Sequence, residues 1–181
     1  MTMEAQEVLE RFKSHVAEWK KTVDKYELED LRKKPDDSNW SLGQVCMHVI
    51  LVHEKFFMKN AHKCLSGEGK NTRKGKNFMG RMIFFFKSIP PMKVKMPKSH
   101  AFEPPQPESK EELNARFDHL IVMMDEVEKK MADADLSIKT KHPLLGMMNV
   151  LEWFKGAEMH IRHHFLQRNR VEKFLERGKV Y

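Results

Sequence analysis

Four stretches of the chain repeat apolar side chains with the period of a helix, and this pattern constrains the fold more than any other feature. They lie at about residues 5–26, 41–61, 109–131 and 149–175. A helix with this period buries one face, and four such helices bury their faces most simply against one another. No stretch shows a strand-like alternation of useful length. The sequence therefore predicts an all-α fold, a four-helix bundle.

Three of the four helices have a recognisable start. Ser41, Ser109 and Asn149 are each followed three residues later by Gln or Glu, which makes a capping pattern. In that pattern the first side chain accepts a hydrogen bond from the backbone of the third helical residue. We therefore expect the second, third and fourth helices to begin at these residues.

The segment from about residue 64 to residue 108 joins the second and third helices, and its recurring glycines and prolines predict an irregular crossover. Only residues 78–89 are apolar enough for a short packed helix. A connection this long can span a bundle, so the two helices that it joins can run parallel. At 181 residues the chain is long enough for one domain with a sizeable core, and we place that domain at residues 1–181.

The net charge is +7, but it is concentrated in the crossover. Residues 63–98 hold ten Lys or Arg residues and one acidic residue, Glu68. Because this excess belongs to a connecting segment and not to a helix face, a nucleic-acid partner is not expected. A solvated loop is the simplest interpretation, and a rim that attracts an anionic small molecule is the alternative.

The two cysteines, Cys46 and Cys64, are isolated in the sequence and predict neither a disulfide framework nor a CxxC site. The longest apolar run, residues 82–86, is far too short to span a bilayer, and the chain starts without a signal-peptide pattern. We therefore expect a cytoplasmic protein with no membrane partner.

His160 and His164 are one helical turn apart in the fourth predicted helix, so both side chains reach the same face. Trp153, Ala157 and Gln167 follow the same stripe, which points this face toward the interior. Such a pair could hold one metal ion, or it could be two structural histidines bonded to core polar groups. The pair alone leaves both possibilities open.

The position of His48 favours a metal site over a pair of structural histidines. This residue lies at the edge of an apolar stripe in the second helix, so three inward histidines would come from two helices. Three neutral nitrogen ligands suit Zn²⁺, Ni²⁺ or Fe²⁺ and leave positions open for water or substrate. His53 is the rival in the same helix, but five residues along an α-helix rotate it by about 140° from His48.

The same residues carry a resemblance to a known family. The run Trp40-Ser-Leu-Gly-Gln-Val-Cys-Met-His48 is similar to the opening of the second helix in the DinB-like superfamily. His142-Pro-Leu-Leu-Gly, Asn149-Val-Leu-Glu-Trp and His160-Ile-Arg-His-His-Phe-Leu-Gln resemble three further motifs of that family, in the same order. The resemblance implies an up-down-down-up bundle, frequent homodimers and metal ligands at His48, His160 and His164.

The resemblance also implies an activity. Members of the family with assigned activities act mainly as metal-dependent thiol S-transferases. We therefore expect a Zn²⁺ or Ni²⁺ site, a small-molecule substrate and a low-molecular-weight thiol as cosubstrate. Basic residues of the crossover could attract the carboxylates of that thiol, and the candidates are Arg73, Lys74, Lys76 and Arg81.

Two alternatives remain at this point. A metal-dependent hydrolase would need a carboxylate near the ion, and Glu158 is the nearest in sequence. Two residues from His160, it points about 160° away from it on a helix. A non-enzymatic helical homodimer, with a structural metal or none, is the alternative of a different class.

Overall fold

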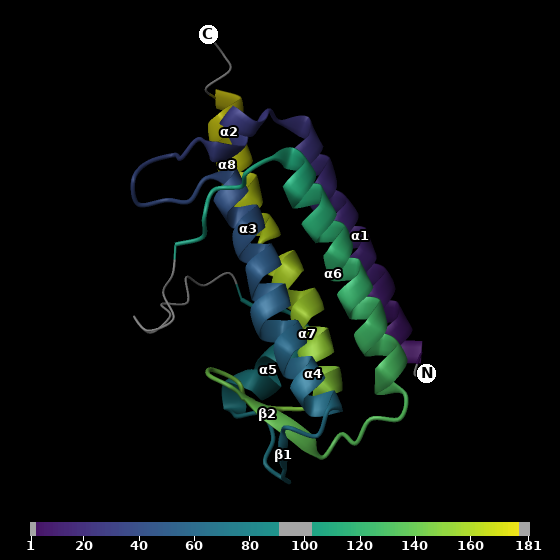
Figure 1. Cartoon of the computed structure of the whole chain (residues 1–181). Helices are drawn as coiled ribbons and strands as arrows, with labels where there is room; N and C mark the ends of the chain where they lie inside the picture. The colour runs from purple at the N-terminus through teal and green to yellow at the C-terminus, as the bar shows by residue number, and fades with distance from the viewer. Residues whose placement is uncertain (1–2, 91–102, 178–181) are drawn as a thin grey trace.

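The computed structural model describes residues 3–90 and 103–177. Most of these residues are helical, in agreement with the all-α prediction, and a small three-stranded sheet lies at one end of the molecule (Figure 1). The elements follow the chain in this order: α1 (Met3–Lys25), α2 (Leu28–Arg32), α3 (Leu42–Val52), the π-helical η1 (His53–Met58), α4 (Lys59–Leu65), β1 (Lys70–Asn71), α5 (Phe78–Phe86), α6 (Lys110–Met131), β2 (Ile138–His142), β3 (Gly146–Met148), α7 (Val150–His163) and α8 (Phe165–Arg177).

The long helices pack along the apolar faces that their periodicity predicts. Helices α3, η1 and α4 form one continuous column, and α7 and α8 form another (Figure 1). Helix α1 lies against α6 and α7, while η1 and α4 lie against α7. Trp19 of α1 stacks on Phe117 of α6 in the fully buried core, with ring centroids 6.0 Å apart.

The three predicted helix starts are confirmed. The backbone N–H of Gln44 donates to Ser41 Oγ at 3.1 Å, and the N–H of Ser41 donates to Gln44 Oε1 at 3.0 Å. Asn149 and Glu152 make the same reciprocal pair at the start of α7. The side chain of Ser109 caps α6. These hydrogen bonds satisfy backbone donors that have no partner inside the helix.

The fourth predicted helix is interrupted where the sequence predicts one continuous helix to about residue 175. The break falls at His164, whose ψ of −7° opens the turn between α7 and α8. The backbone ladder loosens there, with His164 N–H to His160 C=O at 3.4 Å. One of the candidate ligands therefore lies at the junction of two helices and not inside one.

The small sheet was not expected from the sequence. β1 pairs with β2 and β2 with β3, both antiparallel. The turn between β2 and β3 is closed by His142, whose Nδ1 accepts hydrogen bonds from the N–H groups of Leu144 (3.1 Å) and Leu145 (3.2 Å). Gly146 follows with a φ of 93°, a conformation that L side chains rarely adopt. The His-Pro-Leu-Leu-Gly run is thus the turn of a hairpin, and its strands are too short to show alternation.

The crossover contains the short helix that its apolar run predicts. This helix, α5, ends at Lys87, where φ becomes 49°. Of the predicted irregular segment, residues 91–102 lie outside the described part of the chain. At residue 103 the chain packs on the start of α3, because Gln44 Nε2 donates to Glu103 Oε1 and to the carbonyl of Pro104, both at 2.9 Å.

Among residues 3–90 and 103–177, none of the helices has the length and the apolar character that a bilayer span needs.

Candidate metal centre

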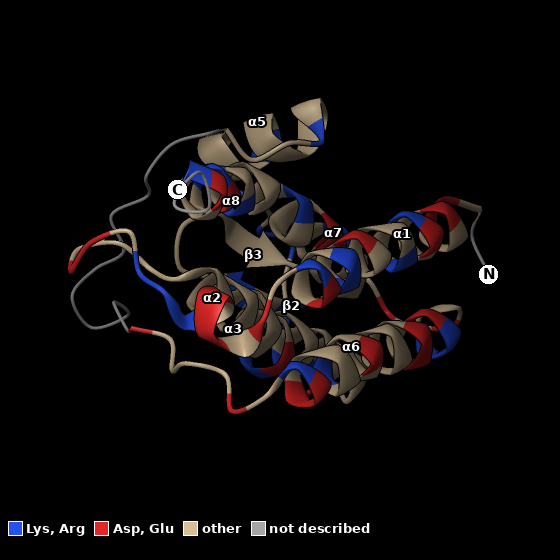
Figure 2. Cartoon of the chain, turned by 90° about the horizontal axis from the view of Figure 1, so that it is seen from above, with Lys and Arg blue, Asp and Glu red and all other residues tan. Residues whose placement is uncertain are grey.

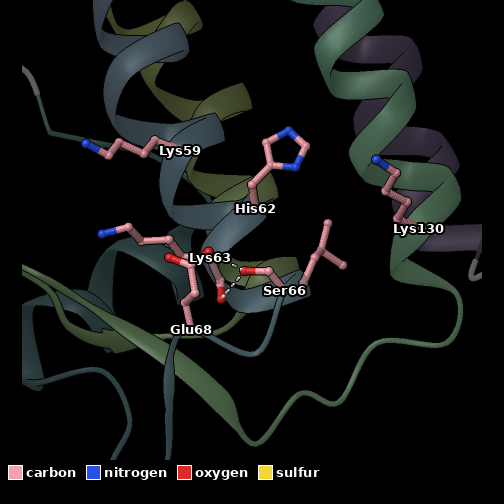
Figure 3. A pocket seen from close by; sticks show the side chains of 7 residues that line it. Lys59, His62, Lys63, Ser66, Glu68 and Lys130 are labelled. Carbon is pink, nitrogen blue, oxygen red and sulfur yellow. Dashed lines mark hydrogen bonds between the residues drawn. The ribbon is translucent and has the colours of Figure 1, made fainter.

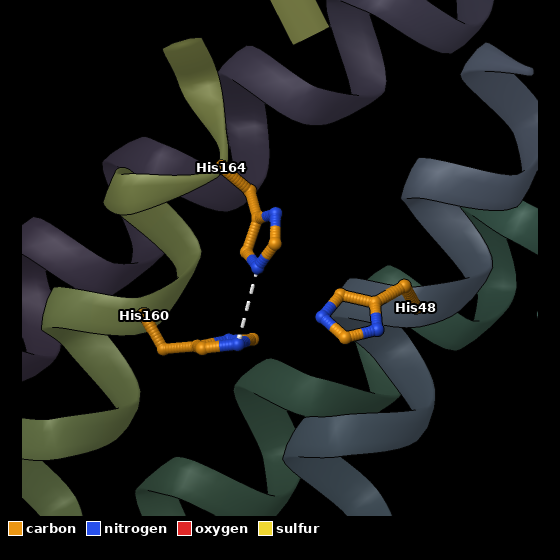
Figure 4. Close-up of side chains that lie close together, drawn as sticks. All are labelled: His48, His160 and His164. Carbon is orange, nitrogen blue, oxygen red and sulfur yellow. Dashed lines mark hydrogen bonds between the residues drawn. The ribbon is translucent and has the colours of Figure 1, made fainter. Parts of the chain in front are cut away.

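Three histidines from two helical columns converge at a part-buried position between these columns. His48 comes from α3, His160 from α7 and His164 from the junction of α7 and α8. One ring nitrogen of each lies within 4.8 Å of the others. The Nε2 atoms of His160 and His164 are 3.2 Å apart, and the three rings turn toward one another (Figure 4). The structure therefore brings together the three residues that the sequence selected.

All three rings are held neutral. Burial lowers the pKa of His48 to about 4 and that of His164 to about 3, because the charged ring would lose its water. The pKa of His160 lies well below its usual value for the same reason, and the neighbouring imidazoles lower it further. A neutral imidazole offers a lone pair, which is the form that binds a metal ion.

The ring nitrogens that face the centre of the cluster fit a bound cation. The Nε2 atoms of His160 and His164 face each other at 3.2 Å, and the ring of His48 points toward them (Figure 4). His164 Nδ1 lies 3.0 Å from Gln167 Oε1, so this nitrogen donates and Nε2 keeps its lone pair. A cation between the rings would accept lone pairs that otherwise face one another. The donor set therefore suits a divalent ion that prefers nitrogen ligands.

Gln167 fixes the orientation of one ligand, and its replacement should weaken metal binding. We expect Gln167→Leu to reduce the affinity for Zn²⁺ by about 10–100-fold, because outer hydrogen bonds orient metal-binding histidines. Gln167→Glu keeps an acceptor oxygen and should stay closer to the wild-type affinity. Competition with a chromogenic chelator measures both. Equal affinities for wild type and the leucine variant would contradict this role.

His53 lies beside the site, which the sequence did not predict. It is fully buried, and its ring lies 5.2 Å from that of His160. Its Nδ1 is 2.6 Å from the carbonyl oxygen of Val49 and its Nε2 is 2.9 Å from that of Ala157. Both ring nitrogens therefore face backbone carbonyls, and His53 links η1 to α7 beside the site. The apolar run before it is the signal of a helix buried on several sides.

Aromatic rings complete the surroundings of the three histidines. Trp40 packs against His48 with ring centroids 5.0 Å apart, and Phe57 lies 5.2 Å from His160. Trp40 is partly exposed. Apolar rings lower the local polarity, which strengthens electrostatic interactions inside the site.

Glu158 points away from the three histidines, in the direction that its helical position predicts. Its Oε1 lies 3.2 Å from His15 Nε2 on α1 and accepts a hydrogen bond from Arg162 Nε at 3.2 Å. The carboxylate is buried and already engaged. Arg162 also donates to the carbonyl of Lys87 at 2.6 Å. Arg162 thereby anchors the end of α5.

A separate groove of about 510 Å³ lies where α4 ends. Figure 3 shows His62 and Lys130 on opposite sides of it, one from α4 and the other from α6. The remaining lining residues are Lys59, Lys63, Leu65, Ser66 and Glu68. His62 is 14 residues after His48 in the same column, which is roughly 20 Å along a helix. The groove is therefore not part of the three-histidine site.

The comparison with known families agrees with the motifs. The model of the DinB superfamily matches residues 11–167. This match includes all three histidines and the segments that orient them. No curated protein matches the chain.

Proposed function

The chain belongs to the DinB superfamily, and we propose that it is a metal-dependent enzyme with one divalent ion held by His48, His160 and His164. The observation that carries this proposal is the cluster of three neutral imidazole nitrogens within 4.8 Å of one another. In the described residues no carboxylate or thiolate joins this cluster. Zn²⁺ and Ni²⁺ suit three nitrogen donors, and the open positions favour a reactive ion over a structural one.

The reaction that we propose is transfer of a low-molecular-weight thiol to an electrophilic small molecule. A divalent ion in this site would lower the pKa of a bound thiol and so supply a thiolate at neutral pH. The residues of the chain have separate tasks. Gln167 orients His164, Phe57 and His53 pack against His160, and Trp40 covers His48.

The four basic residues that could attract the carboxylates of the thiol differ in how free their side chains are. The ammonium of Lys76 pairs with Glu152 and lies over the ring of Phe84, at 4.6 Å from its centroid. Arg73, Lys74 and Arg81 are exposed. A role in attracting the cosubstrate therefore rests on these three.

The alternatives have less support. A hydrolase would use a carboxylate near the ion, but Glu158 is engaged by His15 and Arg162. A non-enzymatic dimer without a metal would leave the three neutral rings without a function. Metal analysis tests this metal-free form directly, because such a protein would contain less than about a tenth of an equivalent of metal and would gain no thermal stability from Zn²⁺ or Ni²⁺. A non-enzymatic dimer with a structural metal is tested by the activity measurement below.

We propose further that the domain is an up-down-down-up four-helix bundle that works as a cytoplasmic homodimer. The course of the chain in Figure 1 supports the bundle: α1 rises, the α3–α4 column and α6 descend, and α7 with α8 rises again. The frequent homodimers that the family resemblance implies support the oligomeric state. Sedimentation equilibrium distinguishes a dimer from a monomer.

The activity is tested by loading the protein with Zn²⁺ or Ni²⁺ and measuring conjugation of several low-molecular-weight thiols to an electrophile. We expect turnover that requires the metal and is lost in His48→Ala. Arg81→Glu serves as a variant outside the ion's ligands, and it should raise KM for an acidic thiol without loss of metal. Absence of metal-dependent turnover with every thiol would overturn the transferase proposal.

A further inference from the structure

Helix α5 presents an unusual apolar surface. Five of its nine residues are large apolar side chains exposed to solvent. Phe78, Met82 and Phe85 follow at intervals of four and three residues, and Met79 and Phe86 lie beside them. They form one continuous stripe on a helix of about 13 Å. Phe78 is 71% exposed and Phe85 78%. We call this stripe the α5 face.

Contacts at both ends of α5 and along its opposite side fix the orientation of the helix, so that the α5 face stays exposed. Asn77 caps the helix, and its Nδ2 donates to the carbonyl of Leu144 at 2.8 Å. The opposite side is packed tightly, because a Cβ at Gly80 would lie 2.5 Å from the carbonyl oxygen of Leu145. Arg162 binds the carbonyl of Lys87 at the other end. Seen from above, α5 lies at the outer edge of the described chain, beyond α8 (Figure 2).

The charge around the α5 face has one sign. Between residues 69 and 90 the sequence has six Lys or Arg residues and no acidic residue. Arg73, Lys74, Arg81 and Lys87 are exposed. Arg81 lies four residues before Phe85 and therefore borders the apolar stripe directly. An apolar stripe with a basic border is the pattern of helices that lie in the surface of a membrane.

We propose that the α5 face docks on the surface of an anionic phospholipid bilayer, with its phenylalanines at the level of the headgroups. Charge complementarity selects this occupant. A second copy of the chain placed symmetrically on the same face would bring the basic borders together and repel. An anionic bilayer has an apolar interior for the phenylalanines and negatively charged headgroups for the basic residues. The docking departs from the expectation of no membrane partner, which rested on the lack of a spanning segment.

The test is co-sedimentation of the full chain with vesicles of phosphatidylcholine alone or with about 30 mol% phosphatidylglycerol. The wild type should bind the anionic vesicles and not the neutral ones, and binding should weaken with salt. The double variant Phe85→Ser/Phe86→Ser should lower the partition coefficient at least about tenfold. Arg81→Glu should lower it about fivefold or more.

Two matched controls isolate the face. Val122→Ser/Leu136→Ser removes two exposed apolar side chains elsewhere, and Lys21→Glu reverses a charge on α1. Both should bind as the wild type does, with unchanged circular dichroism melting. Failure of the wild type to bind anionic vesicles would overturn the proposal. A wild-type dimer that the double serine variant converts to a monomer would overturn it as well, because the face would then join two copies.

Discussion

Replacing His160 with alanine is expected to empty the metal site while the helical fold persists. The ring is one of the three that we propose as ligands, and its Nδ1 is a buried polar atom without a partner in the described chain. Loss of the ring removes packing against Phe57 and His53 but leaves the cap and the core contacts of α7, whereas the ion would lose a third of its protein ligands. We expect the affinity for Zn²⁺ to fall by more than about 100-fold, which is more than the loss expected when the hydrogen bond from Gln167 to His164 is removed.

The measurement combines metal analysis of the purified protein with thermal melting. At a Zn²⁺ concentration of about 100 times the dissociation constant, binding adds about 2.7 kcal/mol, or roughly 5–10 °C in a domain of this size. His160→Ala should lack this gain. His163→Ala is the matched control, because His163 is the next histidine of α7 and is not in the cluster. If both variants kept the Zn²⁺-dependent gain, the site would have to be assigned elsewhere.

The sequence predicts well those parts of the site that depend on residues close together in the chain. Ser41 and Asn149 cap the helices that carry the histidines, and each has its partner three residues away. The spacing of His160 and His164 places both rings on one face for the same reason. The convergence of His48 with them depends on how two columns pack. Its position on an apolar stripe and the family motif supplied that information.

The features that the sequence missed are set by contacts between distant residues. Glu158 is bound by His15, 143 residues away, and no local pattern marks that pair. β1 pairs with β2, which lies far along the chain, and the three strands are too short to have an alternation of their own. The rotation of His53 away from His48 excludes it as a ligand, in agreement with the cluster, but it does not predict that the ring is buried. The α3–α4 column is buried on several sides, and there the same rotation keeps the ring inside.

The metal-free protein should lose stability steeply as the pH falls from 7.5 to 5.0. His48 and His142 are neutral in the fold, because burial lowers the pKa of each to about 4. In the unfolded chain both titrate near 6.5, so below that pH the unfolded state binds protons that the folded state excludes. The contribution of these two histidines to the free energy of unfolding is therefore complete above pH 6.5 and is lost toward pH 4. At pH 5.0 each histidine should lower the free energy of unfolding by about 2 kcal/mol.

Urea unfolding in the presence of a chelator measures this dependence, and His142→Asn isolates one part of it. Asparagine can still accept hydrogen bonds from the N–H groups of the β2–β3 turn, but it does not titrate. The variant should therefore keep the hairpin and show a pH-dependent loss smaller by about 2 kcal/mol. Carboxylates do not interfere, because the pKa of Glu158 and of the other shifted acids is lowered and their effect appears below pH 4.5. An unfolding midpoint that stayed constant from pH 7.5 to 5.0 would mean that these rings accept protons without leaving the fold. The lowered pKa of these buried rings would then have to be abandoned.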